Sequence, residues 1–289
     1  MKFADFEYQA PGTASEVVRL LASRPGEAKI IAGGQSLLPT MAYRLAQPAL
    51  LVDVRNVPDL DRIAIDASGV RLGARTRWRD IEDAGELEAG HPLLKEAISH
   101  VAHYQVRNRG SVGGSLAHGD PASELPCIAV TCDADLRVLG PAGERTIRAD
   151  GFFTGPLSTT LREDEMILEL RLPAWAPGRR WAFQEFARRA GDFAMAGVAL
   201  FYDLDRQQRA CDVHIGVVGA CSRPHRLKAA EAALAGTTVD AQAIAAAARA
   251  ASAEVDPPTD IHATAAYRRA LVGTLLERAL HQAATRAAA

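Results

Sequence analysis

Two glycine-rich segments, far apart along the chain, constrain the fold more than any other feature of the sequence. The first covers residues 30–39, with Gly33 and Gly34 near its start, and the second covers residues 107–121 and has its own glycine pair. Each leads into a stretch with helical character. Paired glycines lack Cβ atoms, so backbone amides can approach a ligand closely, and amides beside a helix N-terminus suit a phosphate. We therefore expect one diphosphate-containing cofactor, held between two parts of the fold.

The overall composition excludes several classes of partner. The chain has 289 residues, of which 48% are hydrophobic and 24% charged, with a formal net charge of −2. This balance does not favour nucleic acid or an anionic membrane as a partner. The first residues lack the apolar core of a signal peptide, and no run of about 18 apolar residues could span a bilayer. We expect a cytoplasmic protein with no membrane insertion.

The cysteines do not form a metal-binding pattern. They stand at 127, 132, 211 and 221, and this spacing fits neither a zinc knuckle nor an iron–sulfur motif. We expect no metal in this chain, and cysteines that are reduced and act as small hydrophobic residues in or near strands.

The first 55 residues have the pattern of a small α/β unit. Thr13 and Glu16 have the spacing of a capping box, which predicts a helix start. A short strand at 29–32, a helix at 36–45 and a second strand at 49–54 follow. This order predicts a strand, a glycine loop, a helix and a returning strand.

The rest of the chain predicts an α+β fold in two further parts. The first part has a hairpin at 63–73, helices at 78–82, 93–101 and 125–131, and strands at 135–139, 144–148 and 165–172. After a linker at 174–178 we expect antiparallel strands at 181–186, 194–204 and 212–218. Ala-rich helices should follow at 226–235, 240–254 and 264–288, with Gly236 as a helix C-cap.

Rival interpretations of the glycine segments are weaker. A single glycine pair is often a simple turn, and neither segment matches the Rossmann or P-loop pattern. Residues 113–117 nearly match a nucleophile elbow, with Ala117 in the last glycine position. His118 and Asp120 stand too near in sequence to complete a standard triad, so a serine hydrolase is disfavoured. We interpret His118, His103 and His100 as loop or cap histidines rather than metal ligands.

Two assignments remain open from the residues alone. Asp120 and Glu124 flank the start of a helix, where a carboxylate can cap the helix or accept hydrogen bonds from a ribityl or ribose hydroxyl. Phe193, after the pair Arg188 and Arg189, could cover a planar cofactor ring or belong to the core, and composition favours the core.

Three segments together resemble one family, the FAD-binding medium subunit of molybdenum hydroxylases, which includes xanthine dehydrogenase and carbon monoxide dehydrogenase flavoprotein subunits. They are residues 32–39, 109–115 and 189–194. The resemblance implies the two-subdomain FAD-binding fold of the vanillyl-alcohol-oxidase (PCMH) type, plus a C-terminal domain of a three-stranded antiparallel sheet and three helices. The implied domains are 1–175, with subdomains at about 1–56 and 57–175, and 178–289.

The resemblance also implies the residues around FAD. Those expected at the diphosphate, through backbone amides and the two hydroxyls of Ser36 and Ser111, are Ile30, Ile31, Ala32, Gly33, Gly34, Gln35, Ser36, Leu37, Ser111, Val112, Gly113, Gly114 and Ser115. Those expected elsewhere along the cofactor are Val101, Ala102, Asp120, Glu124, Ile167, Arg188 and Phe193. Ser115 replaces an asparagine of many relatives. A lysine that some relatives carry near the flavin is absent, and Gln184, Glu185 or Arg188 could replace it.

The implied function is electron transfer, with no catalytic acid or base in this chain. A large partner subunit would carry the molybdopterin-type cofactor and a small one two [2Fe–2S] clusters. FAD would pass their electrons to an external acceptor, in a dimer of heterotrimers. Two alternatives remain: a self-sufficient FAD-dependent oxidoreductase of the same fold, and a scaffold that has lost FAD.

Overall fold

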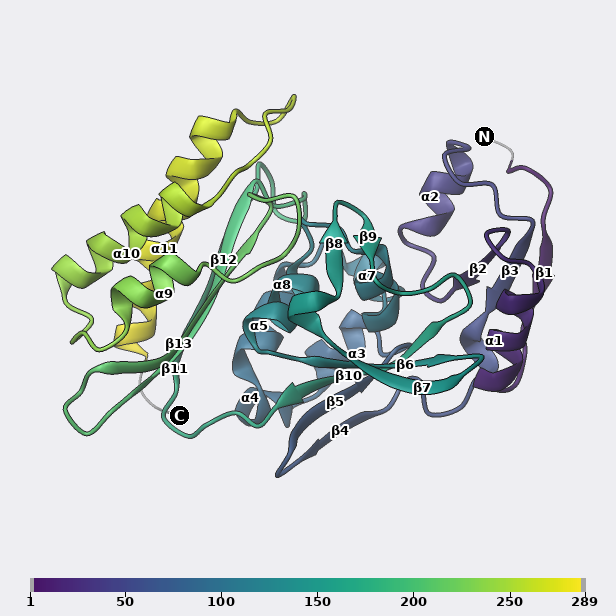
Figure 1. Ribbon diagram of the computed structural model, residues 1–289, viewed down its shortest axis with the longest axis horizontal. Coiled ribbons are helices and arrows are strands. Elements are labelled where there is room, and N and C mark those ends of the chain that lie inside the picture. Colours follow the sequence, from purple (N-terminus) through teal and green to yellow (C-terminus); the bar gives the residue numbers. More distant parts are fainter. Residues whose placement is uncertain (1–2, 287–289) are drawn as a thin grey trace.

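The computed structural model describes residues 3–286, which form three parts arranged in a row (Figure 1). An N-terminal part with a small parallel sheet stands at one end. A central part is built on a five-stranded antiparallel sheet, and a C-terminal sheet with its helices stands at the other end. Among these residues no helix combines the length and apolar character needed to cross a bilayer.

The N-terminal part has the predicted order of elements. Its elements are β1 (Glu7–Gln9), α1 (Ala14–Ser23), β2 (Ala28–Ile31), α2 (Leu37–Ala42), β3 (Leu50–Asp53) and the 3₁₀ turn η1 (Val54–Asn56). The strands are parallel in the order β1-β3-β2. The capping box is confirmed, since Thr13 Oγ1 accepts from the Glu16 amide at 3.2 Å and Glu16 Oε2 accepts from the Thr13 amide at 3.2 Å. The short strand β1 was not predicted.

The central part carries most of the buried core. Its strands are β4 (Ile63–Asp66), β5 (Gly69–Gly73), β6 (Asp135–Gly140), β7 (Gly143–Arg148), β8 (Phe153–Gly155), β9 (Ser158–Thr159) and β10 (Met166–Pro173). The main sheet has the order β4-β5-β10-β6-β7, and its neighbouring strands are antiparallel. Its helices are α3 (Trp78–Asp83), α4 (Leu87–Gly90), α5 (Pro92–His100), α6 (Tyr104–Arg107), α7 (Val112–His118), α8 (Glu124–Thr131) and η2 (Ala149–Gly151).

The C-terminal part confirms the predicted three antiparallel strands and three helices. Strands β11 (Arg180–Phe186), β12 (Ala196–Leu204) and β13 (Ala210–Val218) pair in that order. Helices α9 (Lys228–Leu234), α10 (Ala241–Glu254) and α11 (Ala265–Thr285) follow, and Gly236 has the positive φ of +75° expected of a C-cap. Residues 287 and 288, predicted as the end of the last helix, lie outside the described residues.

The C-terminal sheet is buried on both faces, because alternate residues of a strand point to opposite sides. Ala199 and Phe201 of β12 join the core shared with the central part. Val198 and Leu200 join a second core, formed with α9, α10 and α11. The sheet therefore lies between those helices and the central part (Figure 1).

Helix α8 is the main contact between the central part and the C-terminal sheet. Arg226 Nη1 donates to both carboxylate oxygens of Asp133, just after α8, at 3.0 Å. His214 Nδ1 lies 2.7 Å from the Thr131 carbonyl oxygen. Gly216 of β13 lies so close to α8 that a Cβ atom there would stand 1.9 Å from Thr131 Oγ1. These contacts hold the C-terminal end of α8 against β13.

Candidate cofactor-binding site

The first glycine segment leaves a row of backbone amides without protein acceptors. It follows β2 directly, and Gly34 has a φ of +70°, which favours glycine. The Leu38 amide donates to the Gly34 carbonyl at 3.0 Å, and the Gln35 side chain donates to the Gly33 carbonyl at 3.2 Å. Within residues 3–286, no acceptor is found for the amides of residues 33–36. These amides are available to a ligand.

The second glycine pair lies inside α7 rather than before it. Gly113 and Gly114 occupy the first turn, after the N-cap residue Ser111. The Val112 amide donates to the Thr76 carbonyl at 3.0 Å, and the Gly113 amide donates to the Ala74 carbonyl at 2.7 Å. These two amides, which were expected at the diphosphate, already donate within the protein and hold α7 against the segment that leads into α3.

Other hydrogen-bond donors of the second segment have no acceptor within the described residues. Within the described chain, the amides of Ser111 and Gly114 have no acceptor, whereas the Ser115 amide donates to the Ser111 carbonyl at 3.0 Å. Ser111 Oγ is buried and has no hydrogen-bond partner among residues 3–286. A Cβ atom on Gly114 would stand 2.9 Å from this oxygen, and Gly114 itself is exposed. A buried hydroxyl without a hydrogen-bond partner lowers the stability of the fold unless a ligand supplies that partner.

The two segments touch through their backbones. A Cβ atom on Gly33 would stand 1.9 Å from the Arg109 carbonyl oxygen and 3.0 Å from the Gly110 Cα. No side chain separates the two loops at this point, so their unpaired amides line one cradle. The region around Gly33 and Ser111 therefore fits a diphosphate, which accepts several N–H and O–H hydrogen bonds at once.

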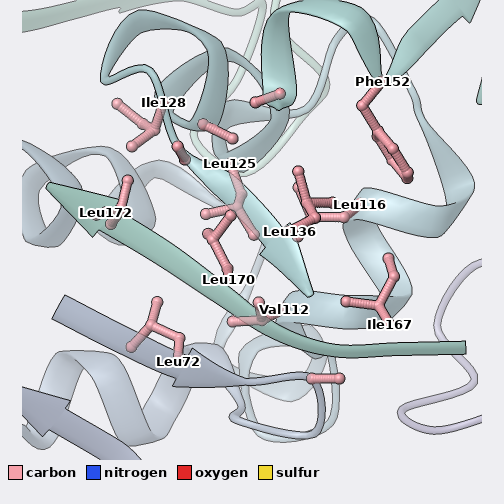
Figure 2. Close-up of a cluster of buried hydrophobic side chains, with 14 of the residues drawn as sticks. Leu72, Val112, Leu116, Leu125, Ile128, Leu136, Phe152, Ile167, Leu170 and Leu172 are labelled. Atoms are coloured by element: carbon pink, nitrogen blue, oxygen red, sulfur yellow. The ribbon is translucent and has the colours of Figure 1, made fainter. Parts of the chain in front are cut away.

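Beneath the second segment lies a close-packed apolar core (Figure 2). Val112 and Leu116 of α7 are fully buried, and Ile167 of β10 is 4% exposed in the same cluster. Ile167, expected near the flavin, therefore lies in this core beside α7 and offers little free surface. The core fixes the position of α7 and of Ser111 at its start.

Asp120 and Glu124, whose roles the sequence left open, lie in different environments. Asp120 Oδ1 accepts from the Ala122 amide at 2.8 Å, so this oxygen shapes the turn before α8. Glu124 opens α8 and is 8% exposed. Burial, opposed by its own amide and aided by the charge of Asp120, raises the pKa of Glu124 to about 7.

A cleft lies between the central part and the C-terminal domain. Ala102, after α5, has a φ of +44°, and Arg107 Nη1 donates to the Val101 and Ala102 carbonyls at 3.0 Å. Gly191 packs against this segment, since a Cβ atom there would stand 2.3 Å from the His103 ring. The resulting cleft has a volume of about 510 Å³ and is lined from one side by residues 99–107 and from the other by residues 185–191.

The aromatic residue after this loop is on the surface. Phe193 is 74% exposed, so the interpretation that it belongs to the core is wrong. It follows a turn in which the Asp192 amide donates to the Arg189 carbonyl at 3.1 Å, and this turn keeps the ring away from the sheet. Arg188 is also exposed and forms no ion pair with any residue among 3–286. Both side chains are free to contact a ligand.

The cysteines and histidines differ in burial. Cys127, Cys132 and Cys221 are buried as small apolar residues, whereas Cys211 is exposed on β13. Within residues 3–286, no group of three or more His, Cys, Asp or Glu side chains could hold a metal ion. His100 packs its ring against Phe183 at 5.0 Å, and burial lowers its pKa.

Sequence reasoning missed Glu185 as part of the buried surroundings of this cleft. The resemblance names Glu185 only among the residues that could replace a lysine of relatives, and nothing in the sequence indicates its burial. Its Oε2 is buried without a partner among the described residues. Burial and the charge of Glu124 raise the pKa of Glu185 to about 8. No signal in the sequence indicates this burial, because β11 is brought against α5 only in the folded chain.

Comparison with known proteins first defines the class of protein to which this chain belongs. Residues 4–175 match the model of the FAD binding domain in molybdopterin dehydrogenase, and residues 181–283 match the CO dehydrogenase flavoprotein C-terminal domain. The arrangement of two such domains in one chain is that of an oxidoreductase subunit that binds FAD.

Relatives match over the full length. The chain is 38% identical to the carbon monoxide dehydrogenase medium chain of Hydrogenophaga pseudoflava, over 98% of each chain. It is 39% identical to the nicotine 6-hydroxylase medium subunit of Paenarthrobacter nicotinovorans, over 99% of this chain and 100% of the other. A solved structure of carbon monoxide dehydrogenase from H. pseudoflava superposes with a TM-score of 0.96, at 40% identity over 100% of both chains. The chain therefore belongs to the FAD-binding medium subunits of the molybdenum hydroxylase family.

Proposed function

We propose that the FAD diphosphate lies in the cradle between the two glycine segments. The amides of residues 33–36, with those of Ser111 and Gly114, would donate to the phosphate oxygens, and Ser111 Oγ would gain the partner it lacks. The observation that carries this assignment is the direct backbone contact between Gly33 and Arg109, which brings these donors together. The other predicted residues of both segments, from Ile30 to Leu37 and from Val112 to Ser115, would shape the cradle.

The isoalloxazine ring would lie toward the cleft between the central part and the C-terminal domain. Ala102 lines this cleft, and Val101 adjoins it. Phe193 is exposed enough to cover a flat ring. We propose Asp120, Glu124 and Arg188 as further contacts along the cofactor, with Ile167 supporting it from below.

The function that these features support is electron transfer within a larger complex. The chemistry supplied by bound FAD is the uptake and release of electrons. This chain binds the cofactor, orients it and sets the charges around it. We infer that electrons arrive from the [2Fe–2S] clusters of a small subunit, after oxidation of substrate at the molybdenum cofactor of a large one. We further infer an external acceptor, a dimer of heterotrimers and a cytoplasmic location.

Purification of the tagged chain from its host tests the assembly. A flavin spectrum with added iron–sulfur absorbance, together with a large and a small companion, would support the proposal. A single yellow chain that turns over substrate by itself would instead support a self-sufficient oxidoreductase. A colourless chain, purified alone, would contradict both.

The cradle itself is tested best at Gly114. Gly33 is unsuitable, because any side chain there would collide with the backbone of Arg109 and move the loop. A Cβ at Gly114 would meet only the Ser111 hydroxyl within 4 Å, so Gly114→Val should fold and fill the cradle. We expect loss of FAD from this variant, measured as the ratio of flavin to protein absorbance.

Gly151→Val is the matched control, since Gly151 lies in the short helix η2 with no atom within 4 Å of its Cβ position. It should retain FAD. Full FAD occupancy in a folded Gly114→Val variant would refute the placement of the diphosphate.

A further inference from the structure

A buried arginine of α11 stands where an apolar side chain is expected. Arg268 is 5% exposed, and Val272 and Leu275, which follow at helical spacing on the same face, belong to the core of the C-terminal domain. Burial of a charged side chain lowers stability unless ion pairs and hydrogen bonds compensate for it. An arginine at this position therefore needs a role that packing alone does not explain.

The guanidinium group of Arg268 joins three segments of the C-terminal domain. Its Nη1 donates to the Met195 carbonyl at 2.6 Å and to the Gly219 carbonyl at 3.0 Å. Its Nη2 donates to Asp260 Oδ2 at 2.7 Å. Met195 lies just before β12, Gly219 just after β13, and Asp260 in the segment before α11. The rigid, planar fork of an arginine can hold several acceptors at fixed angles, which a lysine cannot do equally well.

Asp260, the anionic partner of Arg268, is itself fixed in the segment before α11. Its Oδ1 accepts from the His262 amide at 2.8 Å and from the Ala263 amide at 3.0 Å. These backbone donors, helped by the Arg268 side chain, lower the pKa of Asp260 to about 2. The carboxylate is therefore ionised at neutral pH and holds the guanidinium group in place.

Met195 closes the loop that carries Phe193. Its amide donates to the Phe186 carbonyl at the end of β11, at 2.9 Å, and its carbonyl accepts from Arg268. The Met195 backbone is therefore held from both sides, close behind Phe193 in the chain. Because Phe193 is 74% exposed, core packing does not determine where its ring stands. The position of the ring depends on the backbone that follows it.

Gly219 connects the same arginine to the central part. Its amide donates to the Pro121 carbonyl at 2.9 Å, and Pro121 directly follows Asp120. A Cβ atom on Gly219 would stand 2.5 Å from the Ala194 carbonyl oxygen, and the φ of Gly219 is +70°, so glycine is required between the two loops. The segment after Phe193 and the turn that contains Asp120 are therefore packed together at Gly219.

We propose that Arg268 is a positioning residue for the cofactor, which holds the loop that carries Phe193 at a fixed place beside the turn that carries Asp120. This inference rests on the proposed function, in which Phe193 covers the isoalloxazine ring. Arg268 acts through the Met195 and Gly219 carbonyls rather than by contact with the ring. Its loss should free the loop and uncover the ring, whereas the diphosphate cradle, which other segments form, should still bind FAD.

Three variants separate this role from general packing. Arg268→Met retains an unbranched apolar stem and removes the donors. Asp260→Asn leaves Arg268 in place and removes only the charge of its partner, so it is the milder change. Arg269→Met is the matched control, because this neighbouring arginine pairs with Asp256 at 3.0 Å and donates to the Val255 carbonyl at 3.3 Å, and so binds the segment before α11 instead of the loop.

The first test uses the full chain without cofactor. Trypsin cleaves after the exposed Arg188 and Arg189, inside the loop, and after the exposed Arg206, in the turn at the other end of β12. Arg268→Met should accelerate cleavage in the loop about tenfold, because hydrogen bonds from a charged donor no longer hold the loop closed. Cleavage after Arg206 should be unchanged. Asp260→Asn should show a smaller change of the same kind.

The two cleavage rates, measured by mass spectrometry of the first fragments, decide the outcome. Arg269→Met should cleave like the wild type at both sites. Equal acceleration at both sites in Arg268→Met would indicate a general loss of stability and would overturn the inference, as would wild-type rates in the folded variant. If Arg268→Met does not fold, the same two rates in Asp260→Asn decide.

The second test uses the chain saturated with FAD. Quenching of flavin fluorescence by iodide measures how far the ring is exposed to solvent. Phe193→Ala and Arg268→Met should each increase this quenching, and the double variant should exceed neither by much, because both changes remove the same cover. Additive increases would overturn the link between Arg268 and Phe193. Unchanged quenching in Phe193→Ala would instead contradict the proposed place of the ring, and the cleavage rates would still decide whether Arg268 holds the loop.

Discussion

Ser111 combines burial with an unmet hydrogen-bonding need. It is 4% exposed at the N-cap of α7, a position where serine usually accepts a hydrogen bond from the helix, yet its side chain makes no such bond. A hydroxyl that is buried in this state lowers stability by about 1–3 kcal/mol. The chain therefore keeps a residue that is unfavourable in the cofactor-free protein, as expected where a ligand supplies the missing partner.

Removal of this hydroxyl should weaken FAD binding without harming the fold. We expect Ser111→Ala to bind FAD about tenfold more weakly, which is about 1.4 kcal/mol. The apo chain should be equally stable or slightly more stable. FAD titration by fluorescence and thermal unfolding of the apo chain measure the two effects.

Ser123→Ala provides the control, because Ser123 is also an N-cap serine without a side-chain cap bond, at the start of α8. It should change FAD affinity little. A Ser111→Ala variant with normal affinity and a less stable apo chain would show a structural role instead.

The sequence predicted these residues unevenly. The two glycine pairs and Ser111 carry a local signal, since a glycine pair beside a hydroxyl residue and a helix start is a pattern that suits an anion. Phe193 carries no such signal, because an aromatic residue between Asp192 and Ala194 is compatible with core or surface. Its exposure depends on a turn that only the folded chain reveals. Glu185 was found only through tertiary packing.

Among the elements, prediction succeeded where a local pattern determines the structure. The capping box predicted the start of α1, and Asp66 to Gly69 predicted the turn between β4 and β5. Strands β8 and β9 have three and two residues, too few for any periodicity to show. The start of α7 was missed because glycine is a poor helix former. Gly113 is needed there for close packing on Ala74.

Close packing of α8 on β13 gives a prediction at this scale. Gly216→Ala would place a methyl group 1.9 Å from Thr131 Oγ1 and 3.0 Å from Cys127 Sγ. Overpacking of this kind typically costs about 1–3 kcal/mol. We expect Gly216→Ala to lower the urea midpoint accordingly.

Thr131→Ala should relieve part of that cost. The double variant should then be more stable than the sum of the two single effects predicts, because the methyl and the hydroxyl occupy the same space. Strict additivity would mean that the interface adjusts elsewhere and that this contact does not limit the packing.

Across the whole molecule, the junction between the two domains is built around a neutral histidine. His91 is 1% exposed, its Nδ1 accepts from the Leu94 amide at 3.2 Å, and its ring lies 4.7 Å from that of Trp175. Trp175 in turn contacts Phe201 of the C-terminal sheet at 5.5 Å. Burial lowers the pKa of His91 to about 3.

This shift predicts a loss of stability in acid. The pKa of His91 is lower in the folded chain than the ordinary 6.5, so the unfolded chain binds more protons between about pH 3 and 6.5. The contribution of His91 to the free energy of unfolding is complete above pH 6.5. Below that pH it decreases by up to about 1.4 kcal/mol per pH unit. Thermal unfolding from pH 7 to 4 should show a shallower decline in His91→Asn, which can still cap α5.

Exposed His262 offers the comparison, and His262→Asn should follow the wild-type curve. An identical acid decline in wild type and His91→Asn would mean that His91 is not the group responsible.

The seam between Gly33 and Arg109 has a consequence for how this protein can diversify. Where two main chains touch without an intervening side chain, the spacing is set by covalent geometry, and substitutions at neighbouring positions barely alter it. Substitutions over evolution can then change the outer surfaces and the lining of the cleft, while the spacing of the backbone donors in the cradle stays constant. A cofactor-binding cradle of this kind can be retained unchanged beside many different catalytic subunits.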